Sequence, residues 1–202
     1  MSSLRGKDLL IASGNAGKLA EFSQLLAPFG TRILSLRDFG LDEPEETEVS
    51  FVGNARLKAI AAAVGSGVPA LADDSGLRVE ALGGAPGIFT ADWAERTIGR
   101  DFDHAMATTR RLLLAMRVKP PWKASFHCCL VLVLPDGADF VFDGQLDGQI
   151  VWPKRGLFGH GYDPIFQPAG HDLTMAELSP LFKNQISHRA VAVRKFTSAC
   201  FT

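Results

Sequence analysis

Cysteine is scarce in this sequence: three of the 202 residues are cysteines, at positions 128, 129 and 200. Cys128 and Cys129 are adjacent within an apolar run, which suits buried thiols and matches no zinc-site spacing. Unpaired thiols are typical of a reducing compartment. We therefore expect a cytoplasmic protein.

Long apolar segments are missing as well. No run is long enough to cross a bilayer, and the first residues contain no apolar segment of signal-peptide length. The net charge of -1 provides no basic excess for binding duplex nucleic acid. We expect neither a membrane nor a nucleic-acid partner, although a few local cations could still hold a small anionic ligand.

The sequence does contain enough apolar residues for a sizeable core. Hydrophobic residues make up 47% of the chain and charged residues 21%, which is the balance of a soluble globular protein. No repeat, low-complexity segment or interdomain linker divides the chain. We therefore expect one domain over residues 1–202.

The N-terminal part predicts a strand, a glycine-containing turn and a helix. Residues 8–12 are a short apolar strand, residues 13–18 read Ser-Gly-Asn-Ala-Gly-Lys, and Phe22 and Leu26 follow at helical spacing. Such a turn points free backbone N–H groups outward at a helix N-terminus, where an anion is favoured, and Lys18 would add a cation. The spacing is too short for a Walker A loop. A plain strand-to-helix connection is an equal alternative.

Two adjacent carboxylates follow the next apolar strand. Residues 68–72 lead into Asp73, Asp74, Ser75 and a glycine. These residue types favour a turn, after which residues 77–82 would pair back as a hairpin. Alternation along a strand sends the two aspartates to opposite faces. One can therefore be structural while the other serves a metal or acid–base site.

Further charged residues precede this pair. The acidic stretch at residues 42–48 is typical of a solvated loop, but it could also bring a carboxylate to a cation near Asp74. Ser50 then caps a helix that ends near residue 64. Asn54 and Lys58 are expected on the outer faces of this helix.

The middle of the chain predicts a helix and a hairpin. Residues 103–117 are amphipathic, and residues 124–134 form a long apolar strand that residues 140–142 answer after a turn. His127 lies within that strand. A lone histidine in such a position is typically a hydrogen-bonded core residue rather than a ligand.

The C-terminal part combines glycines with late cations. Residues 155–166 are glycine-rich, which fits either a loop or a wall that a planar ligand can approach closely. Residues 176–184 favour a helix, and Ser187 caps a last one. His188 and Arg189 would lie in its first turn, where the helix dipole disfavours cations. We infer an anionic or acceptor-rich ligand beside them.

Together these features point to phosphate chemistry. Carboxylates beside a phosphate-binding turn would repel the ligand unless a divalent cation lay between them. Magnesium takes one or two carboxylates together with phosphate oxygens and water. The residues therefore predict a magnesium-dependent enzyme that acts on a phosphate ester or anhydride.

Six motifs, in this order, also resemble a known family, the pyrophosphatases of non-standard purine nucleoside triphosphates (inosine/xanthosine triphosphatases). They lie at residues 13–21, 45–55, 72–77, 82–87, 161–166 and 186–189, within a region that spans residues 8–196. The resemblance implies a two-lobed α/β fold around an elongated, twisted mixed sheet, with flanking helices and a central cleft, and a homodimer. It also implies hydrolysis of ITP, dITP or XTP to the monophosphate and pyrophosphate with Mg²⁺.

The resemblance also assigns roles to residues. Asp74 matches the catalytic proton acceptor, and Glu46 and Asp74 match the acidic metal positions. The positions matched to substrate binding are Ser13, Gly14, Asn15, Ala16, Gly17, Lys18, Ser75, His160, Gly161, Tyr162, Asp163, Lys183, His188 and Arg189. Two positions depart from the family pattern: Ser13 replaces a more usual threonine, and His160 stands where many relatives carry phenylalanine. A histidine can still stack on a purine.

Other functions stay open at this point. One is a related pyrophosphatase for other modified nucleotides, such as methylated pyrimidine or oxidised purine triphosphates. Another is a regulatory module that binds nucleotides without turnover, although the acids would hinder mere binding of a polyanion. A third is an interaction protein that uses Phe89, Trp93 and Trp122, which more simply serve a core or a dimer interface.

Overall fold

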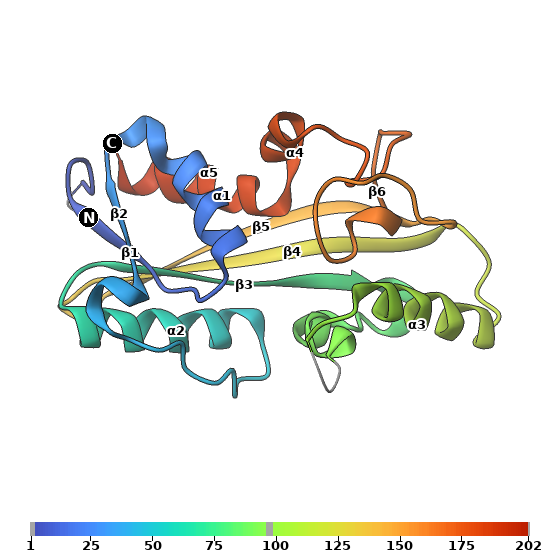
Figure 1. The fold of residues 1–202 in the computed structure, drawn as a ribbon, viewed down its shortest axis with the longest axis horizontal. Helices are drawn as coiled ribbons and strands as arrows, with labels where there is room; N and C mark the ends of the chain where they lie inside the picture. The colour runs from blue at the N-terminus through green and yellow to red at the C-terminus, as the bar shows by residue number, and fades with distance from the viewer. Residues whose placement is uncertain (1–2, 96–98, 202) are drawn as a thin grey trace. The chain divides into compact units, whose positions relative to one another are not determined.

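A six-stranded sheet organises the chain (Figure 1), in a computed structural model that describes residues 3–95 and 99–201. The strand order is β2-β1-β3-β4-β5-β6. The strands are β1 Asp8–Ile11, β2 Arg32–Ser35, β3 Ala70–Val79, β4 Trp122–Val133, β5 Asp139–Ile150 and β6 Phe166–Pro168. β1 pairs in parallel with β2 and β3, whereas β5 and β6 are antiparallel. The predicted α/β class with a mixed sheet and flanking helices is confirmed.

Five α-helices accompany the sheet in the described residues. They are α1 Ala16–Leu26, α2 Phe51–Ser66, α3 Phe102–Ala115, α4 Pro180–Ile186 and α5 His188–Cys200. Short 3-10 helices are η1 Ala27–Phe29, η2 Leu36–Phe39, η3 Glu80–Leu82, η4 Gly87–Thr90, η5 Asp92–Ala94 and η6 Asp163–Ile165. The Ser50 side chain accepts from the Gly53 N–H, so the predicted cap of α2 is confirmed. No helix of the described residues is both long and apolar enough to cross a membrane.

The chain forms two compact units. Unit 1 comprises Met1–Asp74, Cys128–Gly144 and Arg189–Thr202, and unit 2 comprises Ser75–His127 and Gln145–His188. The boundary between Asp74 and Ser75 falls inside β3, so one strand contributes residues to both units.

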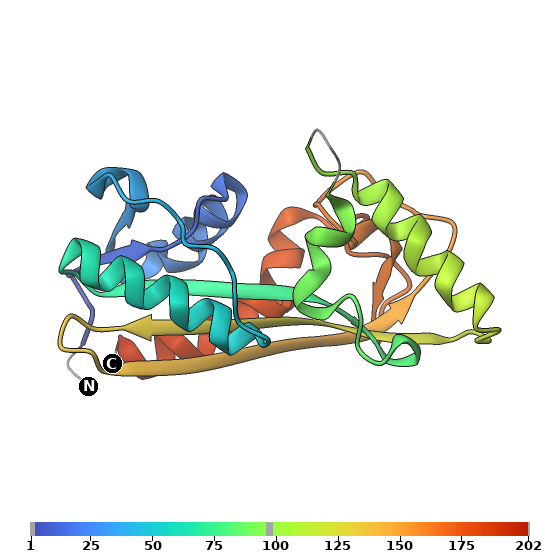
Figure 2. The same ribbon diagram turned by 90° about the horizontal axis from the view of Figure 1, so that it is seen from below.

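In unit 1, strand alternation separates two apolar layers. Leu9 and Leu71 pack with residues of α1 and α5, whereas Leu10 and Ala72 pack with the alanines of α2. α1 and α5 accordingly lie on one side of these strands and α2 on the other (Figure 1). Seen from below, α2 crosses in front of the strands (Figure 2).

Unit 2 has its own aromatic core. Phe126 of β4 packs on Phe166 of β6, with ring centroids 4.3 Å apart. Met106 and Leu113 of α3 belong to the same cluster. Each unit therefore has a hydrophobic core of its own.

The predicted turn at Asp73–Asp74 is wrong, because β3 runs without a break from Ala70 to Val79. The predicted hairpin over residues 77–82 is therefore wrong too: residues 77–79 belong to β3 and residues 80–82 to η3. Turn propensity is local, whereas the partners that let a strand bury two carboxylates come from distant segments.

Other predicted boundaries shift by smaller amounts. β5 continues to Ile150, well beyond the predicted residues 140–142, and α4 covers Pro180–Ile186 rather than residues 176–184. The three cysteines are free and buried, as predicted for Cys128 and Cys129.

We expect Phe196→Ala to destabilise the protein by about 3–5 kcal/mol, since it empties a fully buried aromatic site. The Phe196 ring contacts Phe142 and Phe201 edge-on, each at 5.5 Å between centroids. Urea unfolding measures the change. Val64→Ala, at a position 81% exposed, is the control and should stay within about 0.5 kcal/mol of wild type. Equal losses for the two variants would contradict this account of the core.

Candidate functional site

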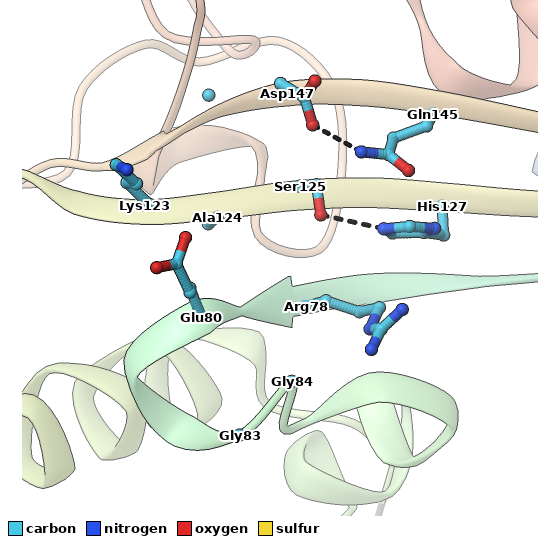
Figure 3. Close-up of a pocket in the computed structure, with 11 residues that line it drawn as sticks. Arg78, Glu80, Gly83, Gly84, Lys123, Ala124, Ser125, His127, Gln145 and Asp147 are labelled. Atoms are coloured by element: carbon cyan, nitrogen blue, oxygen red, sulfur yellow. Dashed lines mark hydrogen bonds between the residues drawn. The ribbon is translucent and has the colours of Figure 1, made fainter.

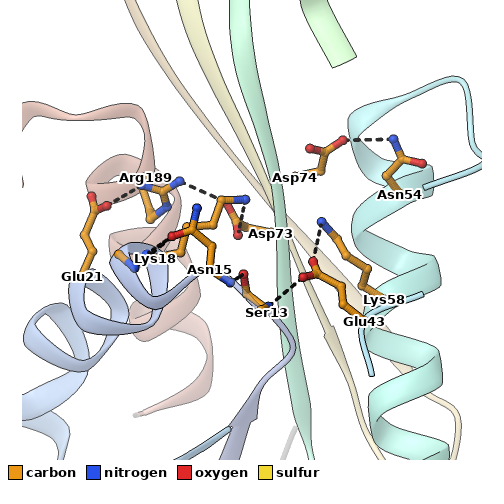
Figure 4. A network of polar contacts seen from close by, with 12 residues as sticks. Ser13, Asn15, Lys18, Glu21, Glu43, Asn54, Lys58, Asp73, Asp74 and Arg189 are labelled. Carbon is orange, nitrogen blue, oxygen red and sulfur yellow. Dashed lines mark hydrogen bonds and ion pairs between the residues drawn. The ribbon is translucent and has the colours of Figure 1, made fainter. Parts of the chain in front are cut away.

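The glycine turn after β1 is closed by side-chain oxygens. Asn15 Oδ1 caps α1 by accepting from the N–H groups of Gly17 at 2.9 Å and Lys18 at 3.2 Å. Ser13 Oγ accepts from Asn15 N–H at 3.2 Å, and Glu43 Oε2 accepts from Gly14 N–H at 2.7 Å. The expectation that these amides are free is therefore wrong, because nearby side chains offer acceptors (Figure 4).

Asp73 joins this turn to the start of α5. The side chain is fully buried; Oδ1 lies 3.0 Å from Lys18 Nζ, and Oδ2 accepts from an Arg189 amino group at 3.1 Å. Burial alone would raise the pKa of Asp73, but the Lys18 and Arg189 cations outweigh it and hold that pKa well below its ordinary value. The carboxylate is thus charged and structural.

Arg189 has a second protein partner. Its other amino group donates to Glu21 Oε2 of α1, so two carboxylates share a guanidinium that is only 4% exposed. Burial opposes the charge, yet the pKa of Arg189 is raised by Asp73 and Glu21. The cation in the first turn of α5 therefore has a structural reason, and it does not require the anionic ligand that the sequence suggested.

Asp74 lies on the opposite side of β3, as alternation predicted (Figure 4). It is 5% exposed, and Oδ2 accepts from Asn54 Nδ2 of α2 at 3.2 Å. Burial and the Glu46 carboxylate raise the pKa of Asp74 to about 6, against the opposing influence of Lys58. The group is therefore short of positive charge, in contrast to Asp73.

Lys58 is the residue that the sequence reading missed. It was expected on an outer face of α2, but it is buried, and so is Asn54. Its Nζ pairs with Glu46 and lies 3.6 Å from Glu43 Oε1. Burial lowers the pKa of Lys58, but the nearby acids raise it above its ordinary value, and Asp73 has the largest raising effect. The i, i+4 spacing of Asn54 and Lys58 places both on one helix face and could have identified this lysine.

Glu46 and Asp74 fit a magnesium ion. Burial and the Glu46 carboxylate raise the pKa of Asp74, and a cation beside both carboxylates would offset that repulsion. Within residues 3–95 and 99–201, no three His, Cys, Asp or Glu side chains gather closely enough to hold a metal by themselves. Magnesium needs only one or two carboxylates when phosphate oxygens and water complete its shell, so this pair suits a metal that arrives with its substrate.

A second group of predicted residues lies in unit 2. Asp163 is buried, and its Oδ2 accepts from Lys183 Nζ at 2.6 Å and from His160 N–H at 2.9 Å. A Cβ at Gly159 would come within 2.2 Å of the same oxygen, so this position requires glycine. Asp163 thus fixes the loop that carries the exposed ring of His160.

Tyr162 and His188 occupy more sheltered positions. Tyr162 is 1% exposed, packs edge-on against Phe102 at 5.8 Å, and has a pKa raised by burial. Gly161 faces the same Phe102 ring. His188 stacks on Phe126 at 5.0 Å between centroids, with ring planes 20° apart. Tyr162 therefore serves the core of unit 2, whereas His160 faces solvent.

The predicted site residues thus fall into two groups. Unit 1 holds Ser13, Gly14, Asn15, Ala16, Gly17, Lys18, Glu46, Asp74 and Arg189. Unit 2 holds Ser75, His160, Gly161, Tyr162, Asp163, Lys183 and His188.

Unit 2 also contains a pocket of about 530 Å³ that none of the predicted site residues lines. Charged side chains of both signs surround it, among them Arg78, Glu80, Lys123 and Asp147 (Figure 3). His127 lines it too, with Nε2 2.8 Å from Ser125 Oγ. The predicted hydrogen bond is confirmed, but the predicted core position is wrong, because the residue is half-buried in the pocket wall.

The raised pKa of Asp74 predicts a pH-dependent effect on stability. Between its ordinary pKa of 3.8 and about 6, the folded protein binds more protons at this site than the unfolded chain does. Wild type therefore loses stability as the pH rises through this window, and Asp74→Asn does not. In urea unfolding with EDTA, we expect the two proteins to match near pH 4 and the variant to be more stable at pH 7, by on the order of 2–3 kcal/mol. A difference that is constant with pH would contradict this.

Comparisons with a family model, with known proteins and with solved structures all point to the same family. Residues 9–199 match the Ham1 family. A protein of Ruegeria pomeroyi named dITP/XTP pyrophosphatase is 54% identical, over 97% of this chain and 96% of its own. One of Rhodospirillum centenum with the same name is 50% identical over the same shares. The solved structure of a HAM1 protein from Coxiella burnetii superposes with a TM-score of 0.88 at 37% identity, over 95% of this chain and 97% of that one. This chain belongs to the Ham1 family.

Proposed function

We propose that the protein is a nucleoside triphosphate pyrophosphatase that hydrolyses dITP, ITP and XTP to the monophosphate and pyrophosphate with Mg²⁺. The printed names of the relatives support this substrate class. The observation that carries the chemistry is the pair of environments around β3. Asp73 is neutralised by Lys18 and Arg189, whereas Asp74 remains short of positive charge beside Glu46.

The turn at residues 13–18 would bind the triphosphate. Its amides lie at the N-terminus of α1, where a negative charge is favoured, and phosphate oxygens would replace side-chain oxygens that now accept from them. Lys18 would exchange part of its pairing with Asp73 for the phosphate oxygens, since its side chain is still 20% exposed. In that position it stabilises the negative charge that develops toward the departing pyrophosphate.

Asp74 would orient and deprotonate the attacking water. A raised pKa makes a carboxylate a better proton acceptor, and the Asn54 hydrogen bond to Oδ2 would orient the carboxylate for that role. Asp74 and Glu46 would hold Mg²⁺, which when bound withdraws charge from the phosphate oxygens. Lys58 would keep Glu46 in position.

The residues of the second group would recognise the base. His160 offers an exposed ring for stacking, and Lys183, held by Asp163, offers donors. Hypoxanthine and xanthine share a keto oxygen that such donors fit, whereas the amino group of adenine would meet donor with donor. An unpaired buried donor costs about 1–3 kcal/mol, which is enough for a preference. The role would be removal of deaminated purines from the nucleotide pool, by a cytoplasmic homodimer.

Release of pyrophosphate from a panel of triphosphates tests the proposal. We expect turnover of dITP, ITP and XTP to exceed that of dATP and dGTP, and to stop with EDTA. Asp74→Asn should reduce kcat at least about 100-fold, the usual scale of a lost general base. Asp172→Asn, at an exposed position, is the control. Equal rates across the panel would leave the phosphate chemistry and refute the base preference; no turnover would leave a binding module.

Lys18→Ala tests the phosphate site separately. We expect KM for dITP to rise at least about tenfold, because a hydrogen bond to a charged group contributes about 1.5–3 kcal/mol. Lys18→Arg should restore part of the loss. Lys119→Ala removes an exposed lysine and should leave KM unchanged. An unaltered KM for Lys18→Ala would place the phosphates elsewhere.

A further inference from the structure

Glu43 binds the glycine turn from a separate loop. It lies between η2 and α2, and its Oε2 accepts from the Gly14 N–H at 2.7 Å. Its Oε1 faces Lys58 Nζ at 3.6 Å. The carboxylate therefore spans the space between the turn and α2 with both oxygens engaged (Figure 4).

The contact is close enough to exclude another anion. Glu43 Oε2 lies 2.7 Å from Gly14 N, at full hydrogen-bond distance, so it occupies the position that another acceptor would take. A phosphate oxygen could not bond the Gly14 amide while the carboxylate is there. Two anions would also repel each other strongly at such a distance.

The carboxylate is held loosely enough to leave. Its side chain is 32% exposed, so water can take over the lost hydrogen bond. Lys58 is 1% exposed and stays in place to balance the charge of Glu43 after the amide is released. Displacement thus breaks one hydrogen bond without leaving a buried charge unpaired.

We propose that Glu43 is an internal competitor for phosphate at Gly14. This rests on the proposed phosphate-binding role of the turn. Glu43 occupies the amide until a triphosphate displaces it, and it returns when pyrophosphate departs. Apparent affinity for phosphate is then reduced by the fraction of molecules in which the amide is occupied, and the return of Glu43 assists product release.

Isothermal titration with sodium pyrophosphate in EDTA-containing buffer tests this on the full chain. Glu43→Gln keeps an oxygen but removes the charge, so we expect pyrophosphate to bind at least about threefold more tightly, because charge-assisted hydrogen bonds are roughly twice as strong as neutral ones. Glu43→Ala removes the acceptor and should gain more. Glu48→Gln is the matched control: it lies in the same loop, is exposed and changes the net charge equally. It should stay within about twofold of wild type.

Three results would overturn the proposal. Equal gains in pyrophosphate affinity for Glu43→Gln and Glu48→Gln would mean that the change in net charge explains the effect. Weaker binding by both Glu43 variants would mean that Glu43 prepares the turn for phosphate instead of competing for it. Failure of every variant to bind pyrophosphate, both in EDTA and with Mg²⁺ in its place, would remove the phosphate site itself.

A result that refutes competition by Glu43 can be told apart from one that refutes the proposed function. If wild type turns over dITP but the Glu43 variants bind pyrophosphate as wild type does, only the competition is refuted. If the Glu43 variants bind pyrophosphate and wild type does not, the result would support Glu43 as a competitor that wild type holds strongly. The backbone amide of Gly14 gives a direct reading by NMR: its resonance should shift on Glu43→Ala and on addition of pyrophosphate, and not on Glu48→Gln.

Discussion

The charge of Asp73 lies buried in β3 between two cations from distant parts of the chain. A buried carboxylate is costly unless it is paired and hydrogen-bonded, and here Lys18 and Arg189 supply that pairing. The same contacts join the glycine turn, the strand and the beginning of α5. Removal of this charge would break one of the ion pairs of Arg189, leave its pair with Glu21, and release Lys18 from its ion pair beside the turn. The position of the proposed phosphate site thus depends on a carboxylate that need not touch the substrate.

Two adjacent aspartates acquire opposite properties because a strand has two faces. Asp73 meets cations from α1 and α5, and its pKa falls; burial and the Glu46 carboxylate raise the pKa of Asp74. The residue types are identical, so the difference comes from the segments that cover each face: α1 and α5 beside Asp73, and the loop with Glu46 beside Asp74. A structural anion and a candidate base can therefore stand side by side in sequence without sharing a site.

The polar groups of the site are held by one another. Asn15 caps α1, Glu43 spans Gly14 and Lys58, and Asp163 binds Lys183. Fixed partners keep donors and acceptors in place, which reduces the reorganisation that binding requires. They also mean that a ligand must exchange contacts that already exist. Affinity at such a site depends on which internal partner is the easiest to displace, and the partly exposed Glu43 differs in this from the buried Asp73.

Residue patterns close together in the chain determined much of this protein: β1 and its turn, the Ser50 cap, the α/β class and the opposite faces of Asp73 and Asp74 all follow from spacing and side-chain type. The order of the motifs identified the family. Only the tertiary structure decided that β3 continues through its acids, that Lys58 is buried, and that Glu43 takes the Gly14 amide. Each of these depends on a partner at least 12 residues away, such as Asp73 with Arg189, 116 residues apart. The residue type alone predicts that burying a charge is costly. It does not predict which distant cation will compensate that cost.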